Sequence, residues 1–244
     1  MTEGAAPPPG AYGRNPMTYR RYAIYYTPRQ SALARFGAAW LGWDVMTGTA
    51  RAAPGVPGLA EPAHSLTETP RRYGFHATIK PPFRLAEGQT GETLAEALET
   101  LTRRLPPADA DALEVTRLGR FVALTAAGET DGIAELAAST VEALDRFRAP
   151  LRQDERDRYG ARALSARQQE LVERWGYPYV MDQFRFHITL SSRLPAARAR
   201  ALEATLAAHL DPILPAPFTL DALTLAGEDA AGMFRAISTH HLRG

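Results

Sequence analysis

Two five-residue stretches decide the predicted fold: residues 75–79 read Phe-His-Ala-Thr-Ile, and residues 186–190 read Phe-His-Ile-Thr-Leu. In both stretches, apolar residues alternate with His and Thr, which is the period of a half-buried β-strand. The apolar side chains should therefore enter a core, and the His and Thr of each stretch should share the opposite face.

The candidate catalytic residues are the polar members of these stretches: His76, Thr78, His187 and Thr189. Paired imidazoles suit acid–base chemistry at a phosphate, because one imidazole can accept a proton while the other donates one. The hydroxyls can hold the non-bridging phosphate oxygens. A single such His would more often be a structural strand residue, so the duplication carries the prediction.

The region around the motifs also repeats. Each motif is followed by a helical pattern and then, at nearly the same distance from the motif histidine, by a similar short sequence. Residues 119–124 read Gly-Arg-Phe-Val-Ala-Leu, and residues 232–237 read Gly-Met-Phe-Arg-Ala-Ile. The order strand–helix–strand–strand, given twice, predicts an α+β fold. We expect a bilobal, pseudo-symmetric duplication in which two antiparallel sheets face a central cleft with helices outside.

The repeat suggests how the chain is divided. We expect a disordered leader over residues 1–16, an N-terminal lobe over 17–147, a charged connector over 148–164 and a C-terminal lobe over 165–244, all within one bilobal domain. Residues 47–70 are rich in Pro, Gly and Ala and predict a long loop.

Shorter signals predict individual elements. Residues 22–26 read as a strand, and residues 31–40 read as a helix that ends near Gly42. A capping box formed by Ser165 and Gln168 predicts the start of another helix.

Composition narrows the class of function. The net charge of +1 gives no global field that would recruit long nucleic acid, and the absence of Cys removes disulfides and thiolate metal sites. No apolar run has the length of a membrane span, and no metal-binding motif is apparent. We therefore expect a cytoplasmic monomer with no membrane partner, no cofactor and no metal.

Candidate substrate-binding residues flank the motifs. Lys80 is the only lysine in the chain, and strict strand alternation places it on the same face as His76 and Thr78, where its ammonium could meet a phosphate. The other candidates are basic or aromatic residues close to the motifs in sequence: Arg72, Tyr73, Tyr177, Tyr179 and Arg185.

The two motifs resemble the H-x-[ST]-x signatures of the two-histidine (2H) phosphoesterase superfamily. The longer segments that include or precede them, residues 71–83 and 175–180, resemble sequences from one branch of that superfamily. This branch is encoded in bacterial phosphonate-utilisation (carbon–phosphorus lyase) operons. The resemblance implies a bilobal fold and metal-free chemistry on a small phosphorylated sugar or nucleotide-like substrate. It specifically implies hydrolysis of 5-phosphoribosyl 1,2-cyclic phosphate to ribose 1,5-bisphosphate.

Two alternatives remain open at this point. An enzyme of the same fold could act on 2′,3′-cyclic or 2′,5′-linked RNA ends, and a non-catalytic module could bind phosphate ligands. Pseudo-symmetry also leaves the roles of the imidazoles open, and we provisionally take His187 as the base and His76 as the acid.

Overall fold

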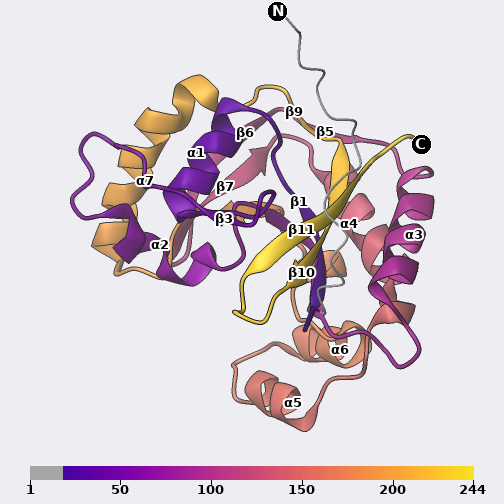
Figure 1. The fold of residues 1–244 in the computed structure, drawn as a ribbon. Helices are drawn as coiled ribbons and strands as arrows, with labels where there is room; N and C mark the ends of the chain where they lie inside the picture. Colours follow the sequence, from indigo (N-terminus) through magenta and orange to yellow (C-terminus); the bar gives the residue numbers. More distant parts are fainter. Residues whose placement is uncertain (1–18) are drawn as a thin grey trace, which may run out of the picture.

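The computed structural model describes residues 19–244 (Figure 1). The predicted leader lies outside the described residues. The central feature is an antiparallel seven-stranded sheet, which confirms the predicted α+β class. In spatial order its strands are β11 (Phe234–His241), β10 (Ala222–Glu228), β1 (Tyr22–Tyr26), β4 (Ala77–Phe83), β8 (His187–Thr189), β7 (Phe121–Ala127) and β6 (Ala112–Leu118).

The sheet consists of two halves that meet between β4 and β8. A single residue pair, Ala77 with Ile188, joins these strands, so hydrogen bonding makes one sheet where two separate sheets were expected. Each half contains strands from both predicted lobes: β1 and β4 pair beside β10 and β11, and β8 pairs beside β6 and β7. The two repeats are therefore interleaved in space.

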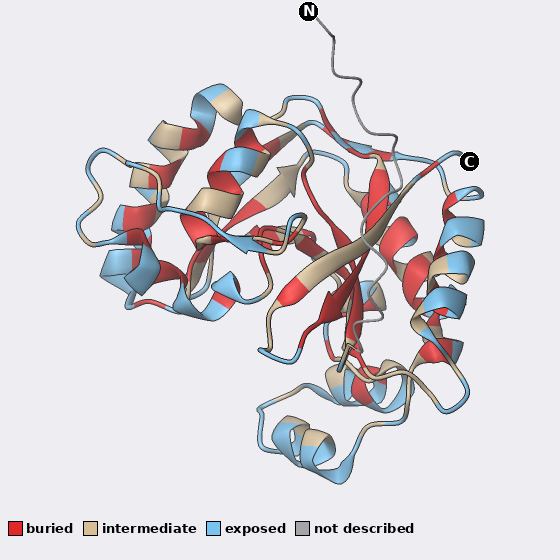
Figure 2. Cartoon of the chain, viewed as in Figure 1, coloured by how far each residue is buried: buried red, intermediate tan, exposed pale blue. Residues whose placement is uncertain are grey.

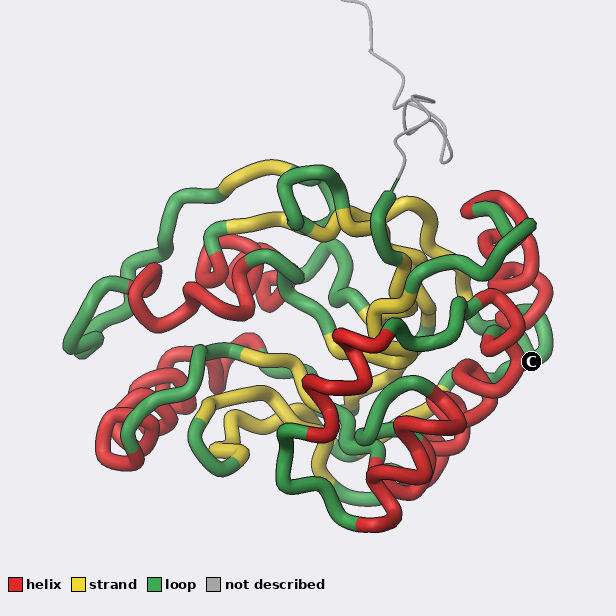
Figure 3. The backbone as a smooth tube through the Cα atoms, turned by 90° about the horizontal axis from the view of Figure 1, so that it is seen from below, coloured by secondary structure: helices red, strands yellow, loops and turns green. Residues whose placement is uncertain are grey.

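Helices cover both halves of the sheet. Helices α3 (Gly91–Thr102) and α4 (Asp131–Ala143) pack on the half that contains β4, and α7 (Ala196–Leu210) packs on β6 and β7. Helices α1 (Ala32–Leu41) and α2 (Ala63–Arg71) lie on the same side of the molecule as α7 (Figure 1). From below, helices are seen on opposite sides of the strands (Figure 3).

The remaining elements are short. They are the strand pairs β2 (Trp43–Asp44) with β3 (Thr49–Ala50) and β5 (Ala108–Ala110) with β9 (Phe218–Leu220), the helices α5 (Gln153–Gly160) and α6 (Ala166–Trp175), and the 3₁₀ turns η1 (Asp145–Phe147), η2 (Met181–Gln183) and η3 (Asp211–Ile213). Every helix within residues 19–244 is too short or too polar to cross a membrane.

Local sequence signals set several element ends. Helix α1 follows its N-cap Ser31 and ends at Gly42, whose φ of 69° is the left-handed conformation that glycine adopts without a Cβ clash. The predicted capping box of Ser165 and Gln168 starts α6 and is confirmed. Burial follows the strands and the sheet-facing sides of the helices, as Figure 2 shows.

The segments predicted as a long loop and as a charged connector both contain helices. The long loop over residues 47–70 includes β3 and most of α2, because Leu66 and Thr67 give that helix a buried side despite its polar composition. The charged connector includes α5, which has no buried residue and is pale along most of its length in Figure 2. The acidic residues in its first turn and its capping contacts favour helix formation, although no residue of the helix is buried against the rest of the protein.

Candidate active site

The junction of β4 and β8 brings the two motifs together. Ala77 and Ile188 are an antiparallel pair, so continuing the register by one residue places His76 opposite Thr189 and Thr78 opposite His187. Side chains directly opposite in such a pair share one face, with Cβ atoms about 5 Å apart. The four candidate catalytic residues therefore form two adjacent His–Thr pairs on one face of the sheet.

Both imidazoles are held in the same way. Nδ1 of His76 lies 2.9 Å from the carbonyl oxygen of Gly74, and Nδ1 of His187 lies 2.8 Å from that of Arg185. A carbonyl oxygen only accepts, so each Nδ1 carries a proton and each Nε2 is left for proton exchange. Nε2 of His76 lies 3.0 Å from Oγ1 of Thr78, whose hydroxyl can donate to it.

A tight turn at Gly74 precedes His76 and fixes where its backbone lies. Gly74 has a φ of 74°, and a Cβ there would come within 2.5 Å of the Val45 side chain. Both the left-handed backbone and the close approach of Val45 require glycine at this point. The turn leads into β4, which begins at Ala77, so His76 itself lies just before the strand.

The surroundings of the two imidazoles differ. The ring of His76 lies against buried Tyr25, with the ring centroids 3.8 Å apart, whereas the nearest aromatic ring to His187 is Phe121 at 5.9 Å. Burial lowers the pKa of His76 to about 4; the hydrogen bond to Gly74 opposes this shift, and the charge of His187 adds to it. His76 is therefore neutral near pH 7 and can accept a proton.

Tyr25 was not among the candidates predicted from the sequence. Its side chain is buried, and its hydroxyl has no hydrogen-bond partner among residues 19–244. The strand prediction for residues 22–26 places Tyr25 in β1, but the stacking on His76 depends on the pairing of β1 with β4, which the sequence does not show.

Lys80 requires a correction. The register between β1 and β4 pairs Tyr25 with Thr78 but Ile24 with Lys80, so a β-bulge interrupts the alternation at Ile79. Lys80 consequently leaves the face of Thr78. Its side chain is only 2% exposed and does not reach a cleft as predicted.

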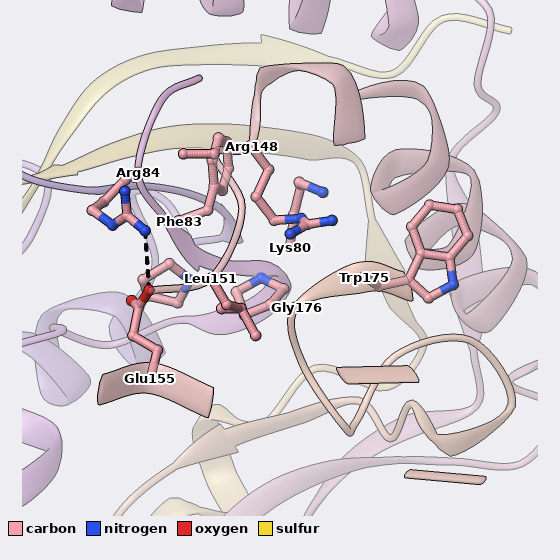
Figure 4. A pocket seen from close by; sticks show the side chains of 11 residues that line it. Lys80, Phe83, Arg84, Arg148, Leu151, Glu155, Trp175 and Gly176 are labelled. Atoms are coloured by element: carbon pink, nitrogen blue, oxygen red, sulfur yellow. Dashed lines mark hydrogen bonds and ion pairs between the residues drawn. The ribbon is translucent and has the colours of Figure 1, made fainter. Parts of the chain in front are cut away.

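The ammonium of Lys80 already has protein partners. Nζ donates to Oδ1 of Asp145 at 3.1 Å and to the carbonyl oxygen of Val141 at 3.2 Å. Burial lowers the pKa of Lys80 to about 8, although the charge of Asp145 opposes this. Figure 4 shows Lys80 at a cavity of about 20 Å³ beside Arg148 and Trp175, which is space on the scale of a single water molecule.

Three of the other predicted binding residues, unlike Lys80, lie close to the motif histidines or contact a residue that does. Tyr73 has its ring centroid 6.2 Å from that of His76, and the guanidinium of Arg72 lies over the Tyr73 ring and donates to its hydroxyl. Arg185 is exposed and holds His187 through its carbonyl oxygen.

Two further predicted aromatics, Tyr177 and Tyr179, form an edge-to-face pair with centroids 5.7 Å apart. Burial raises the pKa of Tyr177 to about 12, whereas Tyr179 is 45% exposed. The structure therefore places Tyr73 near His76, with Arg72 against Tyr73, and gives Tyr177 and Tyr179 mainly each other as ring partners. Within residues 19–244, no group of three or more His, Cys, Asp or Glu side chains is arranged to hold a metal ion.

Three of the solved structures that match this chain do so over similar extents. TT0787 of Thermus thermophilus has a TM-score of 0.46 and 17% identity, over 92% of this chain and 98% of that one. A protein described as a phosphoesterase has a TM-score of 0.42 and 14% identity, over 93% and 100%. E. coli LigT, solved with 3′-AMP, has a TM-score of 0.41 and 15% identity, also over 93% and 100%.

Curated relatives are more similar in sequence but longer. A ribose 1,5-bisphosphate phosphokinase PhnN from Janthinobacterium sp. (strain Marseille) is 38% identical over 221 residues, which are 87% of this chain and 48% of the relative. The protein of the same name from Laribacter hongkongensis (strain HLHK9) is 37% identical over 215 residues, covering 87% and 49%. The chain thus spans about half the length of these relatives.

One family model covers more than half of the chain. It matches residues 78–235, a region that includes the whole second motif and, in the first motif, begins at Thr78. Its description is "Protein of unknown function (DUF1045)", and the chain belongs to this family.

Proposed function

We propose that this chain is a metal-independent cyclic phosphodiesterase that opens a small ribose cyclic phosphate. The supporting observation is the juxtaposition of two His–Thr pairs across β4 and β8, with both imidazoles oriented through Nδ1. Because one chain supplies both motifs, we also propose that the monomer is the active unit.

The chemistry needs two proton transfers. Water attacks the phosphorus of a five-membered cyclic diester, and one bond from phosphorus to a ribose oxygen breaks. One imidazole removes a proton from the water, and the other donates a proton to the departing oxygen. The hydroxyl of Thr189, and that of Thr78 once it turns away from Nε2 of His76, would donate to the non-bridging oxygens, where negative charge is concentrated.

The environments of the imidazoles favour one division of these roles. His76 has a lowered pKa and is neutral near pH 7, so it suits the base that accepts the proton of water. His187 then supplies the proton to the leaving oxygen. This assignment reverses the provisional one made from the sequence, because the stacking of His76 on Tyr25 could not be seen there.

The relatives support a particular substrate. They are named for a kinase activity on ribose 1,5-bisphosphate, and this chain matches about half of each. Opening 5-phosphoribosyl 1,2-cyclic phosphate at the bond to the 2-oxygen leaves the phosphate on the 1-oxygen and yields that compound. We propose that 5-phosphoribosyl 1,2-cyclic phosphate is the substrate and that the bond to the 2-oxygen breaks. The product is then ribose 1,5-bisphosphate, the compound for which the relatives are named.

Phosphorus NMR of the purified chain with 5-phosphoribosyl 1,2-cyclic phosphate tests the proposal. The cyclic phosphate signal should be replaced by one new monoester signal, that of the anomeric 1-phosphate, beside the 5-phosphate signal that the substrate already has. A 2-phosphate signal instead would contradict the proposed bond. A 2′,3′-cyclic nucleotide serves as the comparison substrate, and faster opening of the nucleotide would favour the RNA-end alternative.

The pH dependence of kcat/KM should show the lowered pKa of His76. Acid protonates this base and removes activity, so the acid limb should lie near pH 4 and not near the ordinary histidine value of about 6.5. Steady-state kinetics between pH 3.5 and 8 would measure the limb, and NMR titration of the imidazole protons would assign it. An acid limb near 6.5 that titrates with His76 would contradict the lowered pKa of His76, and an acid limb that does not titrate with His76 would contradict its role as the base.

A further inference from the structure

A second, larger cavity lies between α1 and β11. Its volume is about 910 Å³, within the usual range of small-molecule sites. It is lined by the segment that joins β1 to α1, the first turns of α1, the region of β2 and most of β11. Phe75 forms part of the wall, but none of the four motif residues does, so the cavity is separate from the His–Thr pairs.

Three arginines line this cavity. Arg29 is paired with Asp221 at 2.9 Å and donates to His241 at 2.9 Å, and Arg51 is paired with Asp44 at 2.6 Å. The third, Arg35, is exposed, and its side chain has no ion pair or hydrogen bond within the described part of the chain. Its guanidinium therefore keeps its donors for a group that enters the cavity.

The backbone at the rim adds to the positive potential. Gln30, which lines the cavity, has a φ of 44°, a left-handed conformation that is uncommon and strained for a residue other than glycine. It leads into the N-cap Ser31, and Ala34 in the first turn of α1 also lines the cavity. The amino end of a ten-residue helix, with its partial positive charge, thus lies at the same wall as Arg35.

We infer that this cavity is a second ligand site that binds a phosphorylated small molecule. A guanidinium recognises phosphate through parallel hydrogen bonds, and Arg35 is the group available to form them. Arg29, already fixed by Asp221 and His241, lines the same cavity and would add positive charge there. The volume accommodates a sugar phosphate or a nucleotide and far exceeds that of a single phosphate ion.

Calorimetric titration tests the site with defined probes: ADP and ribose 5-phosphate, with adenosine and ribose as controls without phosphate. The measurement uses the double variant H76A/H187A, which prevents turnover at the His–Thr pairs. We expect one phosphorylated probe to bind and both controls to fail. Arg35→Gln in the same background should weaken that binding at least about tenfold.

The matched control is Arg200→Gln, which removes an exposed arginine on α7 that does not line the cavity. It should leave the affinity unchanged, which separates a specific contact from a loss of net charge. Failure of both phosphorylated probes to bind at millimolar concentration would overturn the inference. So would equal affinity with and without Arg35→Gln, because the probe would then lie at the His–Thr pairs or elsewhere.

Discussion

His76→Ala and His187→Ala should each lower kcat at least about 100-fold, because each removes one of the two proton transfers that the reaction needs. The effect should fall on kcat more than on KM, since Thr78 and Thr189 remain to hold the phosphate. Steady-state kinetics on 5-phosphoribosyl 1,2-cyclic phosphate measures it. Circular dichroism and the thermal midpoint establish that each variant is folded.

Two further variants make this result interpretable. His64→Ala removes an exposed histidine on α2 and should leave kcat unchanged. His76→Gln keeps a side chain against Tyr25 while removing the base, so it serves if His76→Ala unfolds. Retention of more than about a tenth of wild-type kcat by a folded variant of either histidine would refute the paired acid–base role.

The sequence predicts the motif strands well because their signal is local. Alternation over five residues is enough to put Ala77 and Ile188 in the core and the His and Thr residues on the other face. The capping box at Ser165 and the helix end at Gly42 are likewise determined by neighbouring residues. Each of these features needs no knowledge of what the segment packs against.

Features that depend on strand pairing could not be predicted in this way. The interleaving of the repeats follows from β8 pairing with both β4 and β7, which are distant from it in sequence. The stacking of Tyr25 on His76 follows from the register of β1 against β4. The same register contains the bulge at Ile79, and strict alternation therefore predicts the wrong face for Lys80.

Because Lys80 is buried beside Asp145, we expect Asp145→Asn to destabilise the protein much more than Lys80→Met. Asp145→Asn removes the carboxylate that neutralises a lysine whose side chain is 2% exposed, and we expect a loss of about 3–5 kcal/mol in the free energy of unfolding. Lys80→Met replaces the ammonium with an apolar chain of similar length, and Asp145 keeps the guanidinium of Arg148 at 2.8 and 2.9 Å. That variant should change stability by only about 1 kcal/mol.

The double variant K80M/D145N should regain much of the stability that Asp145→Asn loses, because no unpaired buried charge remains at Lys80. Without Asp145 the pKa of Lys80 in the folded state falls further, so the loss in D145N should also shrink as the pH rises from 7 through about 8, where the wild-type lysine loses its own proton. A lysine whose folded-state pKa is lowered binds fewer protons than in the unfolded chain, so rising pH favours the folded state. Urea unfolding at pH 7 and pH 10 measures both effects.

Asp154→Asn is the matched control, since Asp154 is an exposed carboxylate whose ion pair with Arg158 spans 3.8 Å. It should cost no more than about 0.5 kcal/mol. Wild-type stability of D145N would show that Lys80 does not depend on this carboxylate. A folded K80M variant with kcat/KM lowered tenfold or more would show that Lys80 reaches the substrate after all. The structure instead predicts unchanged kinetics, because the bulge at Ile79 directs Lys80 to Asp145 and Val141.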